Sequence, residues 1–424
     1  MFGLDCGRVL WLMYCGEKGD HRMYYRRTLT STIQRASAAF PVVLVTGPRQ
    51  VWKTTLLEHA AKQGRAYVTL DDPQVRLLAK TDPALFFQTY HTPLLIDEIQ
   101  YAQELFPYIK MIADREKTPG LFWLTGSQQF HLMKGVTESL AGRVAVLDLQ
   151  GLSQAEKSGR PNTPPFLPGN RADPQSKALA LRAVYELIVK GSFPALFEGT
   201  KLDRELFYAS YLRTYLERDV RDLLKITDES NFVQFMKAAA ARTGQLLNYS
   251  DLARDVDVSQ NTVKAWLSVL QTSGLVYLLQ PYFNNLTSRL IKTPKLYFMD
   301  TGLCCYLTGW RTAETLESGA MNGALFETYV VTEIIKSYWH HGRQAPVYFY
   351  RDKEMKEIDL VIEENGTLYP IEIKKTASPG SKDIRSFSVL QRQNTKVGHG
   401  AVICLAQRRL PITREVDSVP IGEL

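Results

Sequence analysis

Short apolar runs alternate with longer amphipathic stretches over the first third of the chain. Three of these runs, Val42–Val45, Leu94–Ile96 and Leu121–Thr125, have the length and composition of strands buried on both faces of a sheet. The residues from Thr54 onward have the spacing of apolar positions expected of a helix. Buried strands separated by helices are typical of a parallel sheet covered by helices, so we predict an α/β domain here.

The segment between the first strand and its helix matches a P-loop pattern at every position but one. Gly47 is followed, after four residues, by Trp52, Lys53 and Thr54, where the pattern has Gly-Lys-Thr. In a P-loop the backbone N–H groups wrap the phosphates, the lysine reaches the β- and γ-phosphates, and the hydroxyl holds Mg²⁺. The residues expected to contact ATP are Gly47, Pro48, Arg49, Gln50, Val51, Trp52, Lys53, Thr54 and Thr55.

Trp52 stands where glycine is usual, because the backbone before the lysine lies against phosphate and needs a positive φ. A bulky residue in that conformation costs about 1–3 kcal/mol in strain. We therefore expect Trp52 to weaken the ATP site, and a scaffold that no longer binds ATP remains one alternative.

Polar residues follow the next two predicted strands. Asp97 is expected to hold Mg²⁺ together with Thr54, and Glu98 to activate a water for attack on the γ-phosphate. Ser127 follows the third strand, where a polar side chain can sense the γ-phosphate. Arg143 is a candidate arginine finger, within the chain or across an oligomer interface. Each alone could be a strand end meeting solvent, but their order predicts a P-loop ATPase.

The middle of the chain changes character. Residues 157–177 are rich in Pro, Gly, Ser and Asn, which indicates a linker. Helices are predicted at Lys177–Lys190 and at Tyr208–Leu224, and the second has a face of alternating charge that is ordinarily solvated.

Residues 231–282 have the order of a winged helix-turn-helix. A helix at about Phe232–Arg242 precedes two short helices, capped by Ser250 and Ser259, and a strand at Val276–Leu279. The presumed recognition helix exposes Gln260, Asn261, Lys264 and Ser268. With a single cation on that face, DNA binding and an internal packing role stay open as alternatives.

The last third of the chain contains a strong hairpin signal, Asn365-Gly366 between two alternating segments. A two-residue turn there pairs residues whose numbers sum to 731, which places Asp359 opposite Glu372 with Lys374 on the same face. Two carboxylates can hold Mg²⁺ while the lysine polarises the attacking water. A surface salt-bridge ladder is the plain alternative. The arrangement resembles the PD-(D/E)xK nuclease fold, and Glu327 then resembles the additional acid of that fold, as a further metal ligand.

Composition excludes other classes. The hydrophobic fraction of 45% and charged fraction of 22% are those of an ordinary globular protein. No apolar run is long enough to span a membrane. The five cysteines form no CxxC or ligand spacing, which suits a reducing, cytoplasmic location. The net charge of +7 comes from 51 basic and 44 acidic residues without a basic block, so nothing in the composition requires nucleic acid. Residues 1–22 match a secretory leader poorly, and we expect an unstructured extension whose removal leaves folding unchanged.

A family resemblance covers residues 23–424. It is carried by the segments GPRQVWKTTLLE, LLIDEIQ, LTGSQQF, SLAGRV, YLRTYLERDVRDL, FMDTGLCCYLTG, GALFETYVVTEI and PIEIKK. In this order they resemble the prokaryotic ATPases with an AAA-type core and a C-terminal domain of unknown function 4143. The resemblance implies ATP as the nucleotide and, by analogy with the family's site, offers Arg218 or Arg221 as a second nucleotide sensor.

The predicted fold is α/β, with a P-loop ATPase core, a helical lid, a winged helix-turn-helix and a C-terminal nuclease-like domain. The corresponding boundaries are 1–22 for the extension, 23–156, 157–228, 229–283 and 284–424. We predict an ATP- and Mg²⁺-dependent switch linked to DNA or to a protein partner; the second hypothesis is an ATP-gated, metal-dependent DNA endonuclease. The expected partners are DNA, through the winged helix and the C-terminal domain, and further copies of the chain, but no membrane.

Overall fold

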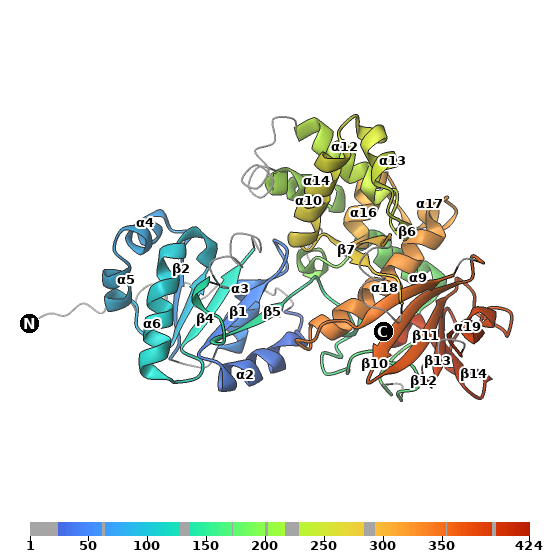
Figure 1. Cartoon of the computed structure of the whole chain (residues 1–424), viewed down its shortest axis with the longest axis horizontal. Coiled ribbons are helices and arrows are strands. Elements are labelled where there is room, and N and C mark those ends of the chain that lie inside the picture. Colours follow the sequence, from blue (N-terminus) through green and yellow to red (C-terminus); the bar gives the residue numbers. More distant parts are fainter. Residues whose placement is uncertain are drawn as a thin grey trace, which may run out of the picture.

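The fold has three parts that follow one another along the chain (Figure 1). The computed structural model describes residues 24–61, 64–127, 136, 138–171, 173–199, 202–216, 229–283, 293–352, 354–391 and 396–424. The predicted extension at 1–22 and the sensor candidates Arg218 and Arg221 lie outside these residues. Among the helices described, none is long and apolar enough to cross a bilayer.

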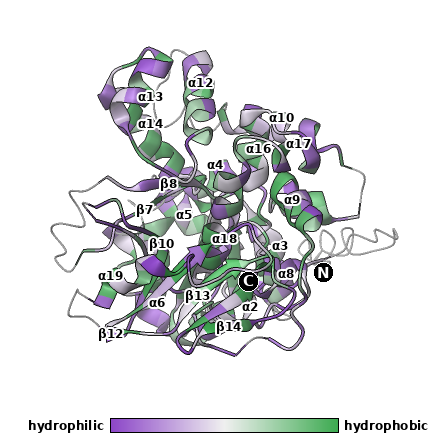
Figure 2. Cartoon of the chain, turned by 90° about the vertical axis from the view of Figure 1, so that its right-hand side faces the viewer, coloured by the Kyte–Doolittle hydropathy of each residue, from purple (hydrophilic) through white to green (hydrophobic). Residues whose placement is uncertain are grey.

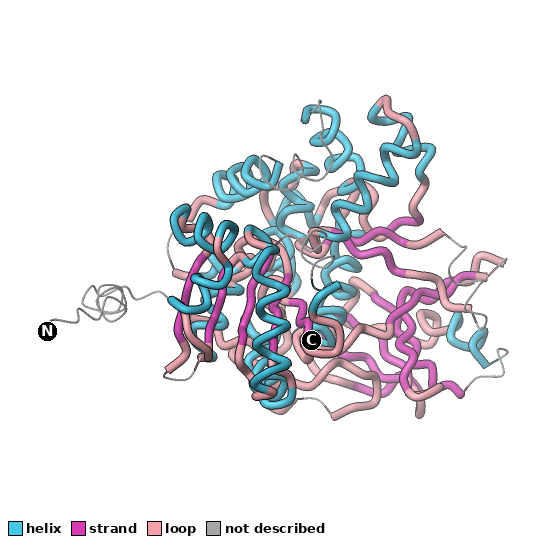
Figure 3. Tube along the Cα trace, turned by 60° about the vertical axis from the view of Figure 1, so that its left-hand side comes forward, coloured by secondary structure: helices cyan, strands magenta, loops and turns pink. Residues whose placement is uncertain are grey.

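The first part is a parallel sheet with strand order β2-β3-β4-β1-β5. Figure 3 shows these strands side by side with helices on both faces. Its elements are α2 (Leu29–Ala39), β1 (Val42–Thr46), α3 (Lys53–Ala60), β2 (Ala66–Thr69), α4 (Pro73–Thr81), α5 (Pro83–Thr89), β3 (Leu94–Asp97), α6 (Phe106–Glu116), β4 (Phe122–Gly126), β5 (Val144–Asp148) and α8 (Gln154–Lys157).

Alternation along the strands decides which helices cover which face. Val43 and Val45 of β1 pack in one core with α2 and α3, whereas Val42 and Leu44 pack in another with α5 and α6. Because both faces are covered, the strands are apolar at nearly every position, as the sequence pattern predicts. The carboxyl ends of β1, β3 and β4 therefore meet at one edge, where the predicted site residues follow them.

The second part is mostly helical and contains a small antiparallel sheet of order β6-β8-β7. Its elements are α9 (Leu181–Lys190), α10 (Arg204–Tyr215), α12 (Glu229–Ala240), β6 (Gln245–Leu246), α13 (Tyr249–Val256), α14 (Gln260–Thr272), β7 (Val276–Leu279), β8 (Lys295–Phe298), α16 (Thr301–Thr308) and α17 (Ala313–Glu317). Figure 2 shows α12, α13 and α14 at the periphery of the molecule.

Two sequence predictions for this part need correction. The boundary predicted at 283/284 falls between β7 and β8, which pair as one hairpin, so the small sheet continues to Phe298. The cap of α13 is Asn248 and not Ser250, because the Asn248 side chain accepts hydrogen bonds from the amides of the next turn. Ser259 caps α14 as predicted.

The third part is a mixed sheet of order β14-β15-β13-β11-β10-β9, with β12 beside β11. Its elements are α18 (Asn322–Trp339), β9 (Val347–Arg351), β10 (Glu357–Glu364), β11 (Thr367–Ile373), α19 (Ser388–Gln391), β12 (Lys396–Val397), β13 (Gly400–Cys404), β14 (Leu410–Thr413) and β15 (Val416–Pro420). The hairpin prediction is confirmed: Glu364 pairs with Thr367 and Leu360 with Ile371, and both turn residues have positive φ.

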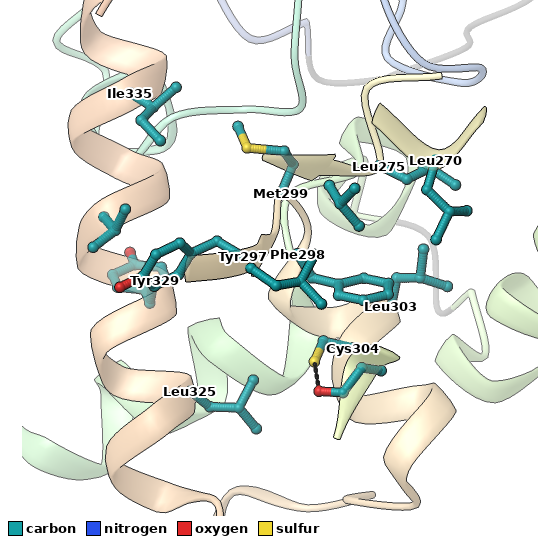
Figure 4. Packing of buried hydrophobic residues seen from close by; sticks show 14 of the residues in the cluster. Leu270, Leu275, Tyr297, Phe298, Met299, Leu303, Cys304, Leu325, Tyr329 and Ile335 are labelled. Carbon is teal, nitrogen blue, oxygen red and sulfur yellow. Dashed lines mark hydrogen bonds between the residues drawn. The ribbon is translucent and has the colours of Figure 1, made fainter. Parts of the chain in front are cut away.

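The three parts share a continuous hydrophobic core. One cluster of buried side chains extends from β1 through α14 and β8 to α18 and β11. Figure 4 shows its central region, where Tyr297 and Phe298 of β8 lie between α18 and the helices of the second part. A backbone bridge between Pro281 and Phe349 also joins the second part to the edge of the third sheet. The sites below are consequently parts of one packed body.

Candidate functional sites

The P-loop connects β1 to α3 and approaches a neighbouring segment closely at its first residue. A Cβ atom at Gly47 would lie 2.0 Å from the carbonyl oxygen of Leu149, which no side chain could tolerate. The φ of Gly47 is also positive, at 142°. Glycine is therefore needed here for space as well as for conformation.

The residue before the lysine has the conformation that the P-loop pattern requires. Trp52 has φ 65° and ψ 45°, which is the left-handed region. Its indole stacks on Tyr24, with ring centroids 6.4 Å apart, and Tyr24 in turn stacks on His59 at 3.7 Å. His59 is exposed on the outer side of α3. The indole is thus directed out of the loop and not into its concave side.

The lysine of the P-loop lies inside the turn of the loop. Lys53 is only 6% exposed, and its Nζ donates hydrogen bonds to the carbonyl oxygens of Gly47 (3.1 Å) and Pro48 (2.8 Å). These contacts place a positive charge within the concave backbone where phosphate oxygens bind in this class of loop.

A cluster of oxygen atoms adjoins the start of α3. The Thr54 hydroxyl donates to Asp97 Oδ1 at 2.6 Å, and the Thr125 hydroxyl donates to the same oxygen at 2.5 Å. Tyr67 and Thr69 donate to Asp97 Oδ2, each at 3.4 Å. Hydroxyl and carboxylate oxygens are the ligands that Mg²⁺ prefers, so the pair of Thr54 and Asp97 fits the predicted metal position.

Glu98 lies beside this cluster with an unusual backbone. Its φ of 56° is left-handed, and its amide donates to the Thr125 hydroxyl at 3.0 Å. The carboxylate accepts hydrogen bonds from the Gln100 amide and from Ser127 Oγ. The predicted residues Glu98 and Ser127 are therefore in direct contact, and the intervening Gln100 is a partner that the motif search missed.

Arg143 lies at the other end of the sheet. It precedes β5, and its carbonyl oxygen accepts from the amide of Val42 at the start of β1. The length of β1 separates it from Gly47 by roughly 15 Å. Its guanidinium forms two hydrogen bonds with Asp114 of α6. An arginine finger acting within the chain does not fit this position, whereas a role toward another copy stays a prediction.

A buried ionic network that the sequence analysis did not find connects the P-loop to α18. Arg27 donates to the carbonyl oxygens of Val51 (2.9 Å) and Gln150 (2.6 Å) and pairs with Glu156 at 3.1 Å. His340, near the end of α18, lies 3.4 Å from the other Glu156 oxygen. These residues are far apart in sequence and belong to no motif, so their contact depends on the fold.

The pKa values of this network reflect its burial. Burial alone would raise the pKa of Glu156, but Arg27 and His340 hold it well below its usual range. Burial lowers the pKa of His340 although Glu156 opposes that shift. A carboxylate matched by one guanidinium is therefore maintained at the junction of the first and third parts.

The second predicted site lies on the hairpin of β10 and β11. Asp359 accepts a hydrogen bond from the amide of Ile373 at 2.8 Å, and Lys374 Nζ donates to Glu372 Oε1 at 2.6 Å. The other Glu372 oxygen is buried without a hydrogen-bond partner, and the residue is 7% exposed. The three residues are thus gathered as the register arithmetic predicts.

Burial raises the pKa of both carboxylates. Burial, then the neighbouring Asp359, raises the pKa of Glu372 to about 8. Burial also raises the pKa of Asp359, although Lys374 and the Ile373 amide oppose it. Because two carboxylates this close and this buried are unfavourable when both are ionised, a cation beside them would be stabilising.

Glu327 has a different role from the metal ligand predicted for it. Its Oε1 accepts from the hydroxyl of Tyr297 at 2.6 Å and from Lys295 Nζ at 3.2 Å, and both donors are on β8. In the part of the chain that the structure describes, no three Cys, His, Asp or Glu side chains gather as a metal site. Among the described residues Asp359, Glu372 and Glu327 are not gathered as one three-carboxylate centre, and Oε1 of Glu327 is taken by Tyr297 and Lys295.

Helix α14 presents the predicted face to solvent. Gln260, Asn261, Lys264 and Ser268 are all exposed. The ammonium of Lys264 lies 5.5 Å from the ring of Tyr249, so the one cation of this set is held near α13.

The parallel order of the first sheet, its P-loop and the Thr54–Asp97 contact define the fold of the P-loop ATPases. Family models match three successive parts of the chain: "AAA domain" at residues 39–157, "Domain of unknown function (DUF8612)" at 181–314 and "Domain of unknown function (DUF4143)" at 322–424. The chain thus joins an AAA-type ATPase domain to a C-terminal domain of unknown function 4143, and the predicted resemblance is confirmed.

Similar whole proteins add little about activity. The uncharacterized proteins Rv2008c of Mycobacterium tuberculosis and Mb2031c of Mycobacterium bovis are each 29% identical over 401 residues, which cover 94% of this chain and 84% of theirs. Among solved structures, the Walker-type ATPase PABY2304 of Pyrococcus abyssi gives a TM-score of 0.44 at 13% identity, over 69% of this chain and 99% of that one. AMPPCP-bound DnaA from Aquifex aeolicus gives 0.25 at 13% identity, over 64% and 90%. These structural likenesses are too distant to support an argument about function.

Proposed function

We propose that the protein binds ATP with Mg²⁺ at its P-loop and acts as a nucleotide-dependent switch linked to DNA or to a protein partner. The observation that carries the proposal is the placement of Lys53 inside the loop next to the hydrogen-bonded pair of Thr54 and Asp97. A cation for the phosphates and an oxygen pair for the metal are the two elements that this chemistry needs.

Each residue has a role that follows from its position. Lys53 would exchange its loop carbonyls for phosphate oxygens, and Thr54 and Asp97 would hold the Mg²⁺ that neutralises charge on those oxygens. Glu98, oriented by Gln100 and Ser127, is the group suited to accept a proton from an attacking water.

The contacts behind the loop support the switch. Pro48 of the P-loop is close enough to Gly274, at the end of α14, for an added Cβ there to meet its ring at 3.1 Å. The carbonyl oxygen of Val51 accepts a hydrogen bond from Arg27. Arg27 pairs with Glu156, and Glu156 in turn contacts His340. A change in loop conformation on ATP binding would therefore act directly on both later parts.

Two kinds of partner fit the proposal. The order of α12, β6, α13, α14, β7 and β8 supports a winged helix, with the exposed face of α14 as the part that meets DNA. With Lys264 as the one cation among the residues predicted to face DNA, this face predicts weak affinity with a shallow dependence on salt. Arg143, at the end of the first sheet away from the P-loop, would have to leave its pair with Asp114 to act as an arginine finger toward a second copy of the chain.

Nucleotide binding is tested by titrating the protein with a fluorescent ATP analogue in Mg²⁺. We expect Lys53→Ala to abolish saturable binding, because it removes the charge that faces the phosphates. Lys80→Ala, which removes an exposed lysine of α4, is the matched control and should bind as the wild type does. Absence of binding by the wild-type protein would leave the scaffold alternative in its place.

A second candidate function is metal-dependent DNA cleavage at Asp359, Glu372 and Lys374. The observation that favours it is the buried, unpartnered Glu372 oxygen beside Asp359, since a divalent cation would supply the missing positive charge. The two carboxylates would hold the cation, and Lys374 would polarise the attacking water.

Cleavage is tested with purified protein and DNA in Mg²⁺ or Mn²⁺, with and without ATP. Asp359→Asn and Lys374→Met should each abolish cleavage while changing DNA affinity little, because these groups act on one phosphate. A wild-type protein that cuts no DNA under any of these conditions would remove this candidate and leave the ATPase proposal untouched.

A further inference from the structure

The second part of the fold contributes a buried lysine to the carboxylate site of the third. Lys295 is the first residue of β8, in the small sheet that follows α14, and it is 4% exposed. Its Nζ lies 2.6 Å from Glu357 Oε1 of β10 and 3.2 Å from Glu327 Oε1 of α18. One ammonium therefore joins three elements at the edge of the site.

Both carboxylates held by Lys295 belong to the same electrostatic cluster as the Asp359–Glu372 pair. Glu327 and Glu357 each interact with the charge of Asp359, and Glu327 also interacts with Glu372. The cluster contains four carboxylates against the two ammonium groups of Lys295 and Lys374. At its rim, Arg351 lies 3.7 Å from the second oxygen of Glu357.

The position of Lys295 is one that a metal ion could otherwise take. Glu327 and Glu357 converge on its Nζ from two elements, and Tyr297 fixes Glu327 by donating to the same oxygen. Two converging carboxylates are a usual arrangement for a divalent cation. The ammonium contacts both carboxylates, but unlike a metal ion it cannot bind a water or a phosphate as a further ligand.

We propose that Lys295 takes the place of a second divalent cation, so that the carboxylate site holds a single metal ion, at Asp359 and Glu372. The inference rests on the second candidate function for the metal at Asp359 and Glu372, but the role of Lys295 can be tested without cleavage. Lys295, together with Arg351 beside Glu357, balances the charges of Glu327 and Glu357, and the remaining carboxylates then need only one divalent cation. Lys295 is a positioning residue, since it acts on the site through these two glutamates.

The test counts Mn²⁺ ions bound to the chelator-treated, nucleotide-free full chain by equilibrium dialysis. All variants carry Asp97→Asn, so that the P-loop does not contribute. We expect Lys295→Gln to bind one Mn²⁺ more than its parent, because Glu327 and Glu357 become free to bind a cation. Adding Glu327→Gln should remove that extra ion, and Lys295→Arg, which keeps the charge, should bind the same number as the parent.

Several outcomes are decisive. A folded Lys295→Gln variant that binds no additional Mn²⁺ overturns the proposal. If Lys295→Gln fails to fold, the single variant Glu327→Gln decides. It should bind as many Mn²⁺ ions as the parent, with the same affinity. If it binds one ion fewer, Glu327 is a metal ligand and the proposal is wrong. If the parent binds no Mn²⁺ and Lys295→Gln binds one, the role of Lys295 stands while the nuclease candidate loses its metal.

Discussion

Trp52 shows how the cost of an unusual residue depends on when that cost arises. Its backbone is already left-handed, and its indole stacks outward on Tyr24. The strain of about 1–2 kcal/mol is therefore part of the folding free energy and is not added when ATP binds. The expectation from sequence that backbone strain at this residue weakens the site therefore loses its physical ground.

We accordingly expect Trp52→Gly to change the Kd for ATP by less than about threefold. That limit is a change in binding free energy of less than about 0.7 kcal/mol, because a tenfold change corresponds to about 1.4 kcal/mol. Glycine relieves the backbone but also loses the stacking on Tyr24 and gains freedom in the unfolded chain, so the melting temperature should change little. The measurement is titration with ATP and Mg²⁺ beside thermal unfolding. Tenfold tighter binding by the variant would mean that the indole obstructs the phosphates.

A second residue-scale prediction concerns Glu372, whose pKa is raised to about 8 by burial and by Asp359. The folded state keeps a proton on Glu372 that the unfolded state releases near pH 4.5. The stability gained from this tighter proton binding is fully present below pH 4.5. It is lost as the pH rises through about 8. Glu372→Gln should therefore be more stable than the wild type at pH 8.5 by at least about 1 kcal/mol, because one pKa unit corresponds to 1.36 kcal/mol.

The difference should vanish at pH 4, and urea unfolding at the two pH values measures it. Glu415→Gln, at an exposed position between β14 and β15, should show no such dependence. An equal effect of Glu372→Gln at both pH values would show that the carboxylate is ionised throughout.

At the scale of elements, the local signals in the sequence were sufficient wherever a strand or turn is specified by its own residues. The three apolar runs form β1, β3 and β4, and the Asn365-Gly366 turn sets the register of β10 and β11. That register brings Asp359, Glu372 and Lys374 together, which is why a site on one hairpin could be predicted.

Contacts between distant segments could not be predicted in the same way. Arg143 fits a motif by its neighbours in sequence, yet it lies at the wrong end of β5 because strand direction decides the edge it occupies. The sequence analysis did not place Lys295 and Tyr297 at the carboxylate site. Both lie on β8, which pairs with β7, whereas the predicted domain boundary at 283/284 separates these two strands. The partners of Glu327 depend on that pairing, and no local pattern contains it.

Gly274 provides a test of the contact between α14 and the P-loop. Its φ is 70°, and an added Cβ would meet Gln150 Nε2 at 3.0 Å and Pro48 Cγ at 3.1 Å. Gly309, which ends α16 with φ 81° and has nothing within 4 Å, is the matched control. We expect Gly309→Ala to cost about 1 kcal/mol from the backbone alone, and Gly274→Ala to cost more.

Only Gly274→Ala should also change the Kd for ATP, because it displaces the loop through Pro48. Chemical denaturation and ATP titration of both variants measure the two effects. Equal stability losses and unaltered ATP affinity in both would mean that α14 and the P-loop are not mechanically linked.

At the scale of the whole molecule, the network of Arg27, Glu156 and His340 holds the first and third parts together. Arg27→Met leaves Glu156 buried without its main counter-charge, and breaking such a pair typically costs about 3–5 kcal/mol. The double variant Arg27→Met, Glu156→Gln should recover part of that loss, because no unmatched charge remains.

Arg182→Met removes a guanidinium from the exposed pair with Glu186 and should cost less than about 1 kcal/mol. Urea unfolding of the wild type, Arg27→Met, Glu156→Gln and the double variant gives the coupling energy between Arg27 and Glu156. Additive losses in the double variant would show that the two side chains do not depend on one another.

The lysine on β8 has a consequence for how such chains can diversify. Residues 322–424 match a family model of their own, but the counter-charge for Glu327 and Glu357 comes from Lys295, outside that range. A recombination event that transferred residues 322–424 alone would separate Glu327 and Glu357 from the ammonium of Lys295. The unit of inheritance for this site must therefore include β8, and a chimaera that begins before Lys295 should remain folded where one that begins at Asn322 does not.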